Sequence, residues 1–241
     1  MKEFKNKKVL ITGGANGIGL ALVESFADLF NQVIFIDRDK AKGKSIEKFY
    51  KNKRNNVSFY YCDLLNFEKS NKTFKKIIKK HKNIDFLINN ARSGVRGEIL
   101  KENEINWNRT LSVILKNSFF FSQEFIRQNR YKKNLKAILN ISSIVTKTIS
   151  MQSPSYHAAK SGLEGITKYL AVHGGKYNIR VNSLSPGFII QKRHYKKFFN
   201  KKNYKYRNWA KNLHPMKNIG TENDIVKSAI FLLSENSKFI N

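Results

Sequence analysis

The chain has 241 residues, which is enough for one large domain or two small ones. It carries 46 lysines and arginines against 17 acidic residues, a net charge of +29, and 41% of its residues are hydrophobic, too many for a disordered chain. Its one cysteine, Cys62, excludes an intrachain disulfide framework and a cysteine-based zinc site, and no apolar run has the length of a membrane span.

The start of the chain is basic, but only the apolar residues 9–11 follow before Thr12-Gly13-Gly14. A secretory signal needs a longer apolar stretch at this place. We therefore expect a soluble cytoplasmic protein with no membrane partner.

Short apolar runs alternate with longer helical patterns along the chain. Continuous apolar runs are typical of strands in a parallel sheet covered on both faces, and the segments between them are long enough for crossover helices. The expected strands span 9–12, 32–37, 57–63, 86–90, 137–142 and 180–185, and the expected helices span 17–30, 39–53, 67–81, 104–130 and 154–172. This alternation predicts one doubly wound α/β domain of the Rossmann type over residues 1–241.

A glycine cluster follows the first strand and opens the first helix, in the run Thr12-Gly13-Gly14-Ala15-Asn16-Gly17-Ile18-Gly19. Glycines allow tight backbone turns, and the start of a helix offers free N–H groups and a positive dipole to a pyrophosphate. No Gly-Lys-Ser/Thr follows, so the loop is not a Walker A motif. Its place between strand and helix predicts a dinucleotide site.

Asp37 ends the second strand, 18 residues beyond Gly19. A carboxylate there accepts hydrogen bonds from the hydroxyls of the adenosine ribose and repels a 2′-phosphate, which favours NAD over NADP. Arg38 leaves the alternative open, because its guanidinium could pair with that phosphate or stack on adenine.

Tyr156 and Lys160 are one turn apart in a helix that begins at Ser153-Pro154. A nearby ammonium favours the phenolate and so lowers the pKa of the tyrosine toward the working pH, as a general acid/base requires. The pair alone is common on helix surfaces, so its meaning depends on the motifs around it.

The segment 188–213 interrupts the alternation of strands and helices. It is basic and aromatic, as in Lys192-Arg193-His194-Tyr195 and Tyr204-Lys205-Tyr206-Arg207. Long insertions after strand ends often cover sites, so we interpret it as a substrate lid. A plain surface excursion is the second interpretation, and stacking on nucleotides is the third.

Several motifs resemble the short-chain dehydrogenase/reductase family, in the same order and over residues 7 to about 240. Ser143 lies 13 residues before Tyr156, which is the family spacing. Besides the glycine loop and the Tyr156–Lys160 pair, the similar motifs are Asp63-Leu64, Asn89-Asn90-Ala91, Asn140-Ile141-Ser142-Ser143 and Pro186-Gly187.

The resemblance implies hydride transfer between NAD(H) and a small alcohol or ketone, with NADP less favoured, and a homodimer or homotetramer. Tyr156 would be the acid/base, Lys160 would hold the nicotinamide ribose and tune Tyr156, and Ser143 would bind the substrate oxygen. The cofactor contacts it implies are Gly13, Gly17, Ile18, Gly19, Asp37, Arg38, Asp63, Leu64, Asn90, Ala91, Tyr156, Lys160, Pro186, Gly187 and Ile189.

Three features depart from the family pattern. Ile114 stands where many members have a helix asparagine that supports a proton-relay water, and we expect Asn117 to lie near the same face and substitute for it. Arg92 replaces a glycine after Asn89-Asn90-Ala91. The chain stops before the family's usual seventh strand, so either the sequence is truncated or the sixth strand has an exposed edge. A looser resemblance is to a bacterial subgroup that also lacks the helix asparagine, and it is carried by Asn-Ala-Arg-Ser-Gly at 90–94, Ser-Pro-Ser-Tyr-His at 153–157 and Leu-Ala-Val-His-Gly-Gly at 170–175.

Two other functions remain open. Ile114 and the short C-terminus favour a dinucleotide-binding protein with weak or no catalysis, whereas the net charge of +29 favours a nucleic-acid binder. The lysines are spread over the whole chain with no nucleic-acid motif, as a Lys- and Asn-rich coding bias would also produce, so nucleic acid is the less favoured partner. Five scattered histidines show no ligand spacing, and we predict no metal site.

Overall fold

The computed structural model describes residues 2–93, 97–132 and 134–241. Its centre is a six-stranded parallel sheet in the order β3-β2-β1-β4-β5-β6. The strands are β1 Lys8–Thr12, β2 Gln32–Asp37, β3 Val57–Tyr61, β4 Phe86–Asn89, β5 Lys136–Ile141 and β6 Ile179–Leu184. The order reverses between β1 and β4, which makes this the switch point of a doubly wound fold. The predicted fold class is confirmed.

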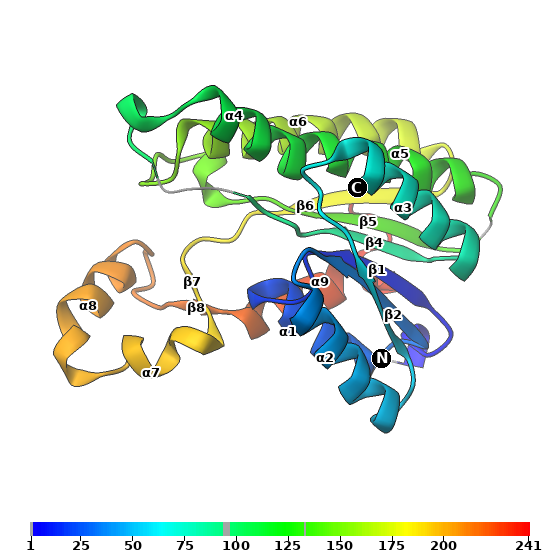
Figure 1. Cartoon of the computed structure of the whole chain (residues 1–241), viewed down its shortest axis with the longest axis horizontal. Helices are drawn as coiled ribbons and strands as arrows, with labels where there is room; N and C mark the ends of the chain where they lie inside the picture. The colour runs from blue at the N-terminus through cyan, green and yellow to red at the C-terminus, as the bar shows by residue number, and fades with distance from the viewer. Residues whose placement is uncertain (1, 94–96, 133) are drawn as a thin grey trace.

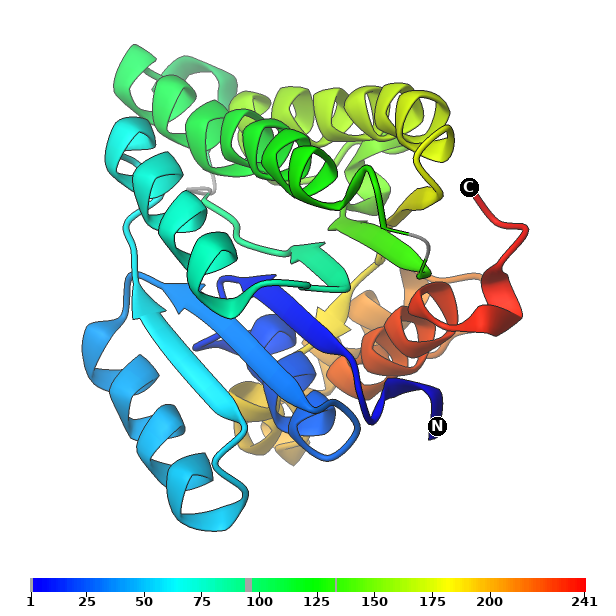
Figure 2. The same cartoon turned by 90° about the vertical axis from the view of Figure 1, so that its right-hand side faces the viewer.

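Helices cover both faces of the sheet (Figures 1 and 2). On one face lie α1 Gly17–Ala27, α2 Lys40–Lys53 and α9 Glu222–Leu233, and on the other lie α3 Phe67–His81, α4 Glu104–Leu111, α5 Asn117–Asn129 and α6 Pro154–Gly175. The strand side chains alternate between the two cores: Val9 and Ile11 pack with α1 and α9, whereas Leu10 packs with α3, α5 and α6. The strands β1 and β2 carry apolar side chains on both faces because they contribute to both cores, whereas in β6 the polar Arg180 and Asn182 alternate with Ile179 and Val181.

The predicted helix 104–130 is divided in the structure. A π-helical turn, Ser112–Lys116, separates α4 from α5. Such a turn adds a residue to the helical repeat and rotates everything that follows it. Shorter 3₁₀ turns occur elsewhere, at Lys2–Phe4, Ile99–Lys101, Ile144–Thr146, Lys192–His194, Lys201–Asn203 and Glu235–Ser237.

The segment 188–213 leaves the sheet as an excursion of its own (Figure 1). It contains β7 Ile189–Ile190, α7 Tyr195–Phe198 and α8 Tyr204–Asn212, and β7 pairs with β8 Gly220–Thr221 outside the main sheet. Its aromatic rings pack mainly on one another: the ring centroids of Tyr206 and Trp209 are 5.5 Å apart and stacked. The segment therefore has a small core of its own.

The end of the chain lies along β6. The Asn241 side chain accepts a hydrogen bond from Val181 N (2.7 Å), and the Ile240 carbonyl accepts one from Asn182 Nδ2 (2.9 Å). Among the residues that the structure describes, no seventh strand joins the sheet, but these contacts satisfy part of the β6 edge. No helix in the same residues is both long and apolar enough to cross a membrane.

Candidate active site

The glycine loop after β1 is tied to the loop after β4. The hydroxyl of Thr12 accepts hydrogen bonds from the backbone N–H groups of Asn90 and Ala91, each at 3.0 Å. In return, the Asn90 amide donates to the Thr12 and Gly13 carbonyls. Gly13 has a φ of +70°, and a Cβ there would lie 2.9 Å from Ala91 Cα, so only glycine fits. The two loops therefore form one backbone surface at the switch point.

Asp37 is oriented by the same glycine loop. Its carboxylate accepts hydrogen bonds from Ala15 N and from Asp39 N, both at 2.9 Å. Six of the predicted cofactor contacts line one pocket of about 80 Å³, together with Arg92: Gly13, Asp37, Arg38, Asp63, Leu64 and Ala91. Residues from four different loops thus meet where the sequence predicts the adenosine end of a dinucleotide.

Gln191 is a site residue that the sequence analysis missed. Its side-chain amide lies against the glycine loop, with Nε2 only 2.9 Å from the point where a Cβ on Gly17 would be. Gln191 Oε1 is buried and has no hydrogen-bond partner among the described residues. A buried amide oxygen without a partner is costly, and a ligand at the loop could satisfy it. The signal in the sequence is weak: Gln191 only follows the Pro186-Gly187 turn by a few residues.

Tyr156 and Lys160 lie on the buried side of α6. Ser153 caps this helix, its hydroxyl accepting from Tyr156 N (3.3 Å), and Pro154 occupies the first turn. Lys160 is 2% exposed, and its Nζ donates to the carbonyl of Ile141 at the end of β5 (2.5 Å). The Lys160 Nζ is 5.7 Å from the centroid of the Tyr156 ring. The helix thus places the ammonium beside the phenol, at the carboxyl edge of the sheet.

The environment of Lys160 changes its proton affinity. Burial disfavours the charged form and, with the positive charge of Arg92, lowers the pKa of Lys160 from 10.5 to about 7. The ammonium of Lys160 can therefore lose its proton near neutral pH. A buried group with a strongly shifted pKa is a typical feature of an active site.

Ser143 is the second residue after β5. Its backbone is extended, and its Oγ accepts a hydrogen bond from Val145 N at 3.4 Å. The next residue joins this loop to the Pro186-Gly187 turn, because Ile144 N donates to the Pro186 carbonyl (2.9 Å). Val145 and Tyr156 belong to one small hydrophobic cluster, so the structure brings the serine loop and the tyrosine helix together.

The remaining predicted contacts lie around the Pro186-Gly187 turn. His214 Nε2 accepts from Phe188 N (3.1 Å), and a Cβ on Gly187 would lie 2.6 Å from that nitrogen. Ile18 and Ile189 are half-buried and pack against the core formed with α1 and α9. His214, another residue that the sequence analysis did not select, thus ties the segment 188–213 to the turn.

The prediction for Asn117 is wrong. Its amide donates to the carbonyls of Leu64 (2.8 Å) and Ser112 (2.7 Å), and its oxygen accepts from Ser70 Oγ (2.6 Å). These partners lie toward α3 and use the side chain fully, because the π-helical turn rotates Asn117 away from α6. Ile114, in contrast, is buried in the cluster that contains Tyr156.

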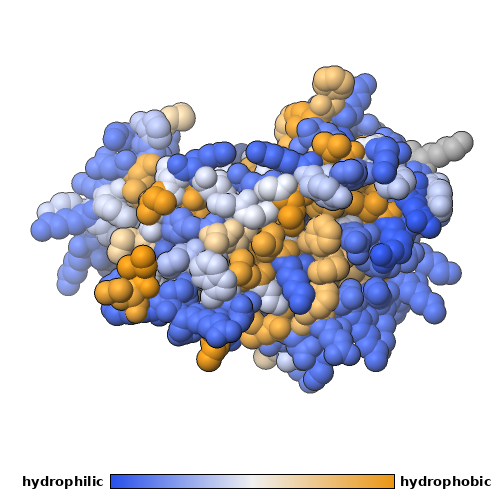
Figure 3. Space-filling model, turned by 90° about the horizontal axis from the view of Figure 1, so that it is seen from above, coloured by the Kyte–Doolittle hydropathy of each residue, from blue (hydrophilic) through white to orange (hydrophobic). Residues whose placement is uncertain are grey.

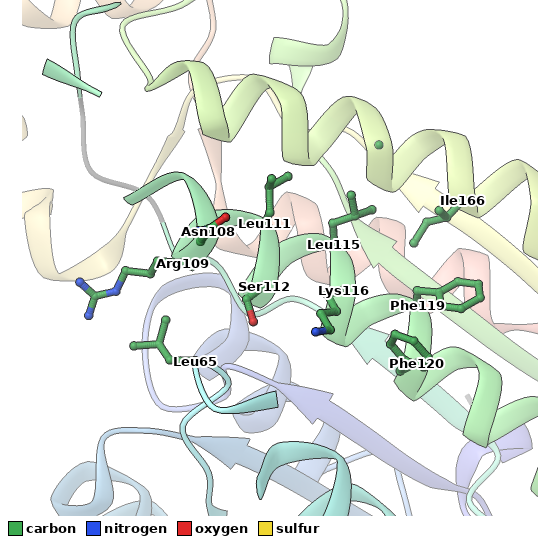
Figure 4. A pocket seen from close by; sticks show the side chains of 11 residues that line it. Leu65, Asn108, Arg109, Leu111, Ser112, Leu115, Lys116, Phe119, Phe120 and Ile166 are labelled. Carbon is green, nitrogen blue, oxygen red and sulfur yellow. The ribbon is translucent and has the colours of Figure 1, made fainter. Parts of the chain in front are cut away.

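A second cavity lies on the outer face of α4, α5 and α6. It has a volume of about 730 Å³ and contains none of the predicted site residues. Leu111 and Leu115 point toward α6, and Ile166 points back from it (Figure 4). Seen from above, this face shows a band of apolar residues between hydrophilic ones (Figure 3). This groove was not among the sites predicted from the sequence.

Doubly wound proteins bind their ligands at the switch point, beyond the carboxyl ends of the strands, and the loops described above meet there. The fold and this site define a dinucleotide-binding α/β protein. Residues 13–241 match the family described as Enoyl-(Acyl carrier protein) reductase. The chain belongs to the short-chain dehydrogenase/reductase family, and the predicted family is confirmed.

Individual relatives agree with this assignment. The 3-oxoacyl-[acyl-carrier-protein] reductase FabG of Chlamydia pneumoniae is 32% identical over 97% of this chain and 92% of its own. The probable galactose dehydrogenase GalD of Rhizobium meliloti is 33% identical over 79% of this chain and 75% of its own.

Solved structures resemble the whole fold. The 4-hydroxyisoleucine dehydrogenase complexed with NADH has a TM-score of 0.86 at 28% identity, covering 98% of this chain and 94% of that one. ElxO with NADP bound has a TM-score of 0.85 at 29% identity and the same coverage. The protein is an NAD(P)-dependent oxidoreductase that acts on hydroxyl or keto groups.

Proposed function

We propose that the protein transfers a hydride between NAD(H) and the carbon of a small alcohol or ketone, with Tyr156 as the acid/base. The observation that carries the proposal is the placement of Lys160: it is buried, bonded to the end of β5, and next to Tyr156. This pair lies at the sheet edge that also holds the dinucleotide pocket.

The described residues fit a dinucleotide. Gly13 and Gly17 have φ angles of +70° and +52°, which give the tight backbone turn that leads into α1, and the start of that helix offers free N–H groups to a pyrophosphate. Gln191 Oε1, which lacks a partner among the described residues, faces the same loop. When bound, the nicotinamide ring supplies or accepts the hydride.

The negative charge of Asp37 favours NAD(H). Backbone N–H groups on two sides hold its carboxylate in place, so it cannot swing away from a ribose at the end of β2. A 2′-phosphate at this position would meet that charge. Arg38 lines the same pocket, and its positive charge would favour the 2′-phosphate of NADP(H). The test is therefore to compare the Kd values of NADH and NADPH.

Residues of the chain donate and accept the proton that accompanies the hydride. In the reductive direction Tyr156 donates its phenolic proton to the substrate oxygen as the carbonyl carbon gains the hydride, and in the oxidative direction the phenolate removes it. Lys160, with a pKa of about 7, can supply a proton to the tyrosine oxygen after the transfer. Ser143 donates a hydrogen bond to the substrate oxygen, which its hydroxyl can do while accepting from Val145 N.

Replacement of Tyr156 by phenylalanine tests this role. The ring packing remains, so NADH should bind as before, while turnover of small ketones should fall by about two or more powers of ten. Full turnover in the Tyr156→Phe variant would contradict the assignment. Tight NADH binding with no turnover by the unmodified protein would favour the weakly catalytic alternative, which the apolar Ile114 beside Tyr156 supports.

Two parts of the molecule have proposed roles around this site. The segment 188–213 acts as a lid, since Gln191 touches the glycine loop at its start and its small core lets it move as a unit. The groove on α4, α5 and α6 is the contact face of a homodimer or homotetramer. Support comes from its apolar lining: Leu65, Leu111, Leu115, Phe119, Phe120 and Ile166.

A further inference from the structure

One carboxylate on α6 binds hydroxyl groups from both loops that surround the proposed catalytic serine. Glu164 lies one helical turn after Lys160, and its side chain is 16% exposed. Its Oε1 atom accepts hydrogen bonds from Ser185 Oγ (2.6 Å), Thr146 Oγ1 (2.9 Å) and Ser142 Oγ (3.2 Å). Three hydroxyls therefore converge on a single oxygen.

These hydroxyls bracket Ser143 in the chain. Ser142 precedes Ser143 directly, and Thr146 follows it by three residues, with its Oγ1 also 3.1 Å from the Ser143 carbonyl. Ser185 comes immediately before the Pro186-Gly187 turn. Glu164 thus joins α6 to the loop after β5 and to the loop after β6.

The charge of Glu164 fixes the direction of these bonds. Partial burial raises the pKa of Glu164, but hydrogen bonds from Ser185, Thr146 and Ser142 and the charge of Lys147 together outweigh it and hold the pKa below its ordinary value. An ionised carboxylate only accepts hydrogen bonds, so each hydroxyl must direct its hydrogen toward Oε1. Such bonds to a charged acceptor are stronger than those between neutral groups.

Ser143 depends on its neighbours for its position. Its Oγ accepts from Val145 N at 3.4 Å, a length at which a hydrogen bond is weak. The backbone on either side is better held: Ser142 N donates to Leu184 O (2.8 Å), and Ile144 N donates to Pro186 O (2.9 Å). Glu164 binds side chains on both sides of the serine and so restrains the same stretch from the direction of α6.

We propose that Glu164 is a positioning residue that holds Ser143 where its hydroxyl can bind the substrate oxygen. The inference rests on the role proposed above for Ser143. Glu164 does not touch the substrate, and it acts through the loop after β5.

The first experiment compares Glu164→Ala and Glu164→Gln in the full chain. The substrate is the ketone reduced fastest in a panel that begins with ethyl acetoacetate, and turnover is followed by loss of NADH absorbance. Alanine removes the acceptor, so kcat should fall about tenfold, the effect of one ordinary hydrogen bond. Glutamine keeps a carbonyl oxygen at the same place and should retain most of kcat, and the Kd for NADH should change less than about twofold.

Glu124→Ala is the matched control. Glu124 is 5% exposed and binds Arg127 and Gln128 on α5, so the variant also loses a buried carboxylate but no contact with the serine loop. It should leave kcat unchanged. An equal loss of kcat in Glu124→Ala would mean that destabilisation, rather than positioning, explains the Glu164→Ala result.

A double-mutant cycle with Ser143→Ala separates positioning from general damage. If Glu164 acts through Ser143, adding Glu164→Ala to Ser143→Ala should cause no further loss. The same tenfold loss in both backgrounds would overturn the proposal. Full turnover in Ser143→Ala alone would instead refute the serine's role in the proposed function.

Backbone hydrogen exchange decides the point without any substrate. Glu164→Ala should speed exchange in residues 142–147 and 185–187 and leave α1 and β1 unchanged. Unchanged protection in 142–147 would overturn the proposal even if turnover falls.

Discussion

Lys160 should make the free energy of unfolding depend on pH, and replacing this lysine should remove its contribution. Its pKa is lowered from 10.5 to about 7 in the folded state, with burial as the main cause. Below pH 7 both the folded and the unfolded state bind the proton, so no pH dependence arises there. Between the two pKa values the unfolded state binds more protons, and the free energy of unfolding therefore rises with pH.

The magnitude follows from the size of this window. Each pH unit within it is equivalent to about 1.4 kcal/mol, so the contribution of Lys160 should grow by about 2 to 3 kcal/mol between about pH 6 and about pH 9. Lys160→Met keeps the length of the chain and removes the titration. Unfolding by urea at both pH values, with and without this substitution, measures the difference.

Between the two pH values, the free energy of unfolding of the wild-type protein should rise by about 2 to 3 kcal/mol more than that of Lys160→Met. The substitution should therefore be most favourable for stability at the acidic pH, where the buried charge is present. The same stability difference at both pH values would refute the lowered pKa. Arg92→Ala supplies a second check, because the loss of the neighbouring charge should shift the start of the rise to a higher pH.

Three further predictions concern the cofactor, the lid and the groove. NADH should bind more tightly than NADPH, and Asp37→Ala should narrow the ratio of the two Kd values about tenfold; tighter NADPH binding by the wild type would contradict the role of Asp37. Limited proteolysis should cut 192–212 before the sheet and its helices, and NADH with substrate should protect this segment; no protection at saturation would argue against a lid. Leu115→Arg should break the homo-oligomer in sedimentation measurements, with Phe239→Arg, on an exposed side chain outside the groove, as the control. A monomeric wild-type protein would exclude the proposed interface.

The sequence predicted the main sheet well because its strands have an unusually clear signal. The strands β1 and β2 pack on both faces and appear as short apolar runs, and the observed bounds of all six strands differ from the predicted ones by at most two residues. The glycine loop was predictable for a similar reason. Gly13 and Gly19 each lie where a side chain would collide with backbone, so only glycine fits there and its presence in the sequence marks the loop.

Residues defined by tertiary contacts could not be predicted in the same way. Gln191 matters because its amide lies against Gly17, and Glu164 matters because three hydroxyls from two loops reach it. A glutamine or a glutamate at these positions does not by itself indicate a functional site in the sequence. Asn117 illustrates the opposite error. Counting residues along a regular helix predicts that it lies beside Ile114. The π-helical turn, which the sequence does not reveal, instead directs its side chain toward α3.

The helix α6 connects the two surfaces for which roles are proposed. One side of it carries Tyr156 and Lys160, and the other carries Ile166 and Gly162, which line the outer groove. A Cβ on Gly162 would lie 2.9 Å from a methyl carbon of Leu115, so the π-helical segment packs closely on α6 at this point. A second copy of the chain seated in the groove would bury this contact and hold the helix that carries the acid/base pair. Association and catalysis should therefore be coupled, and the specific activity should fall on dilution below the dissociation constant of the oligomer.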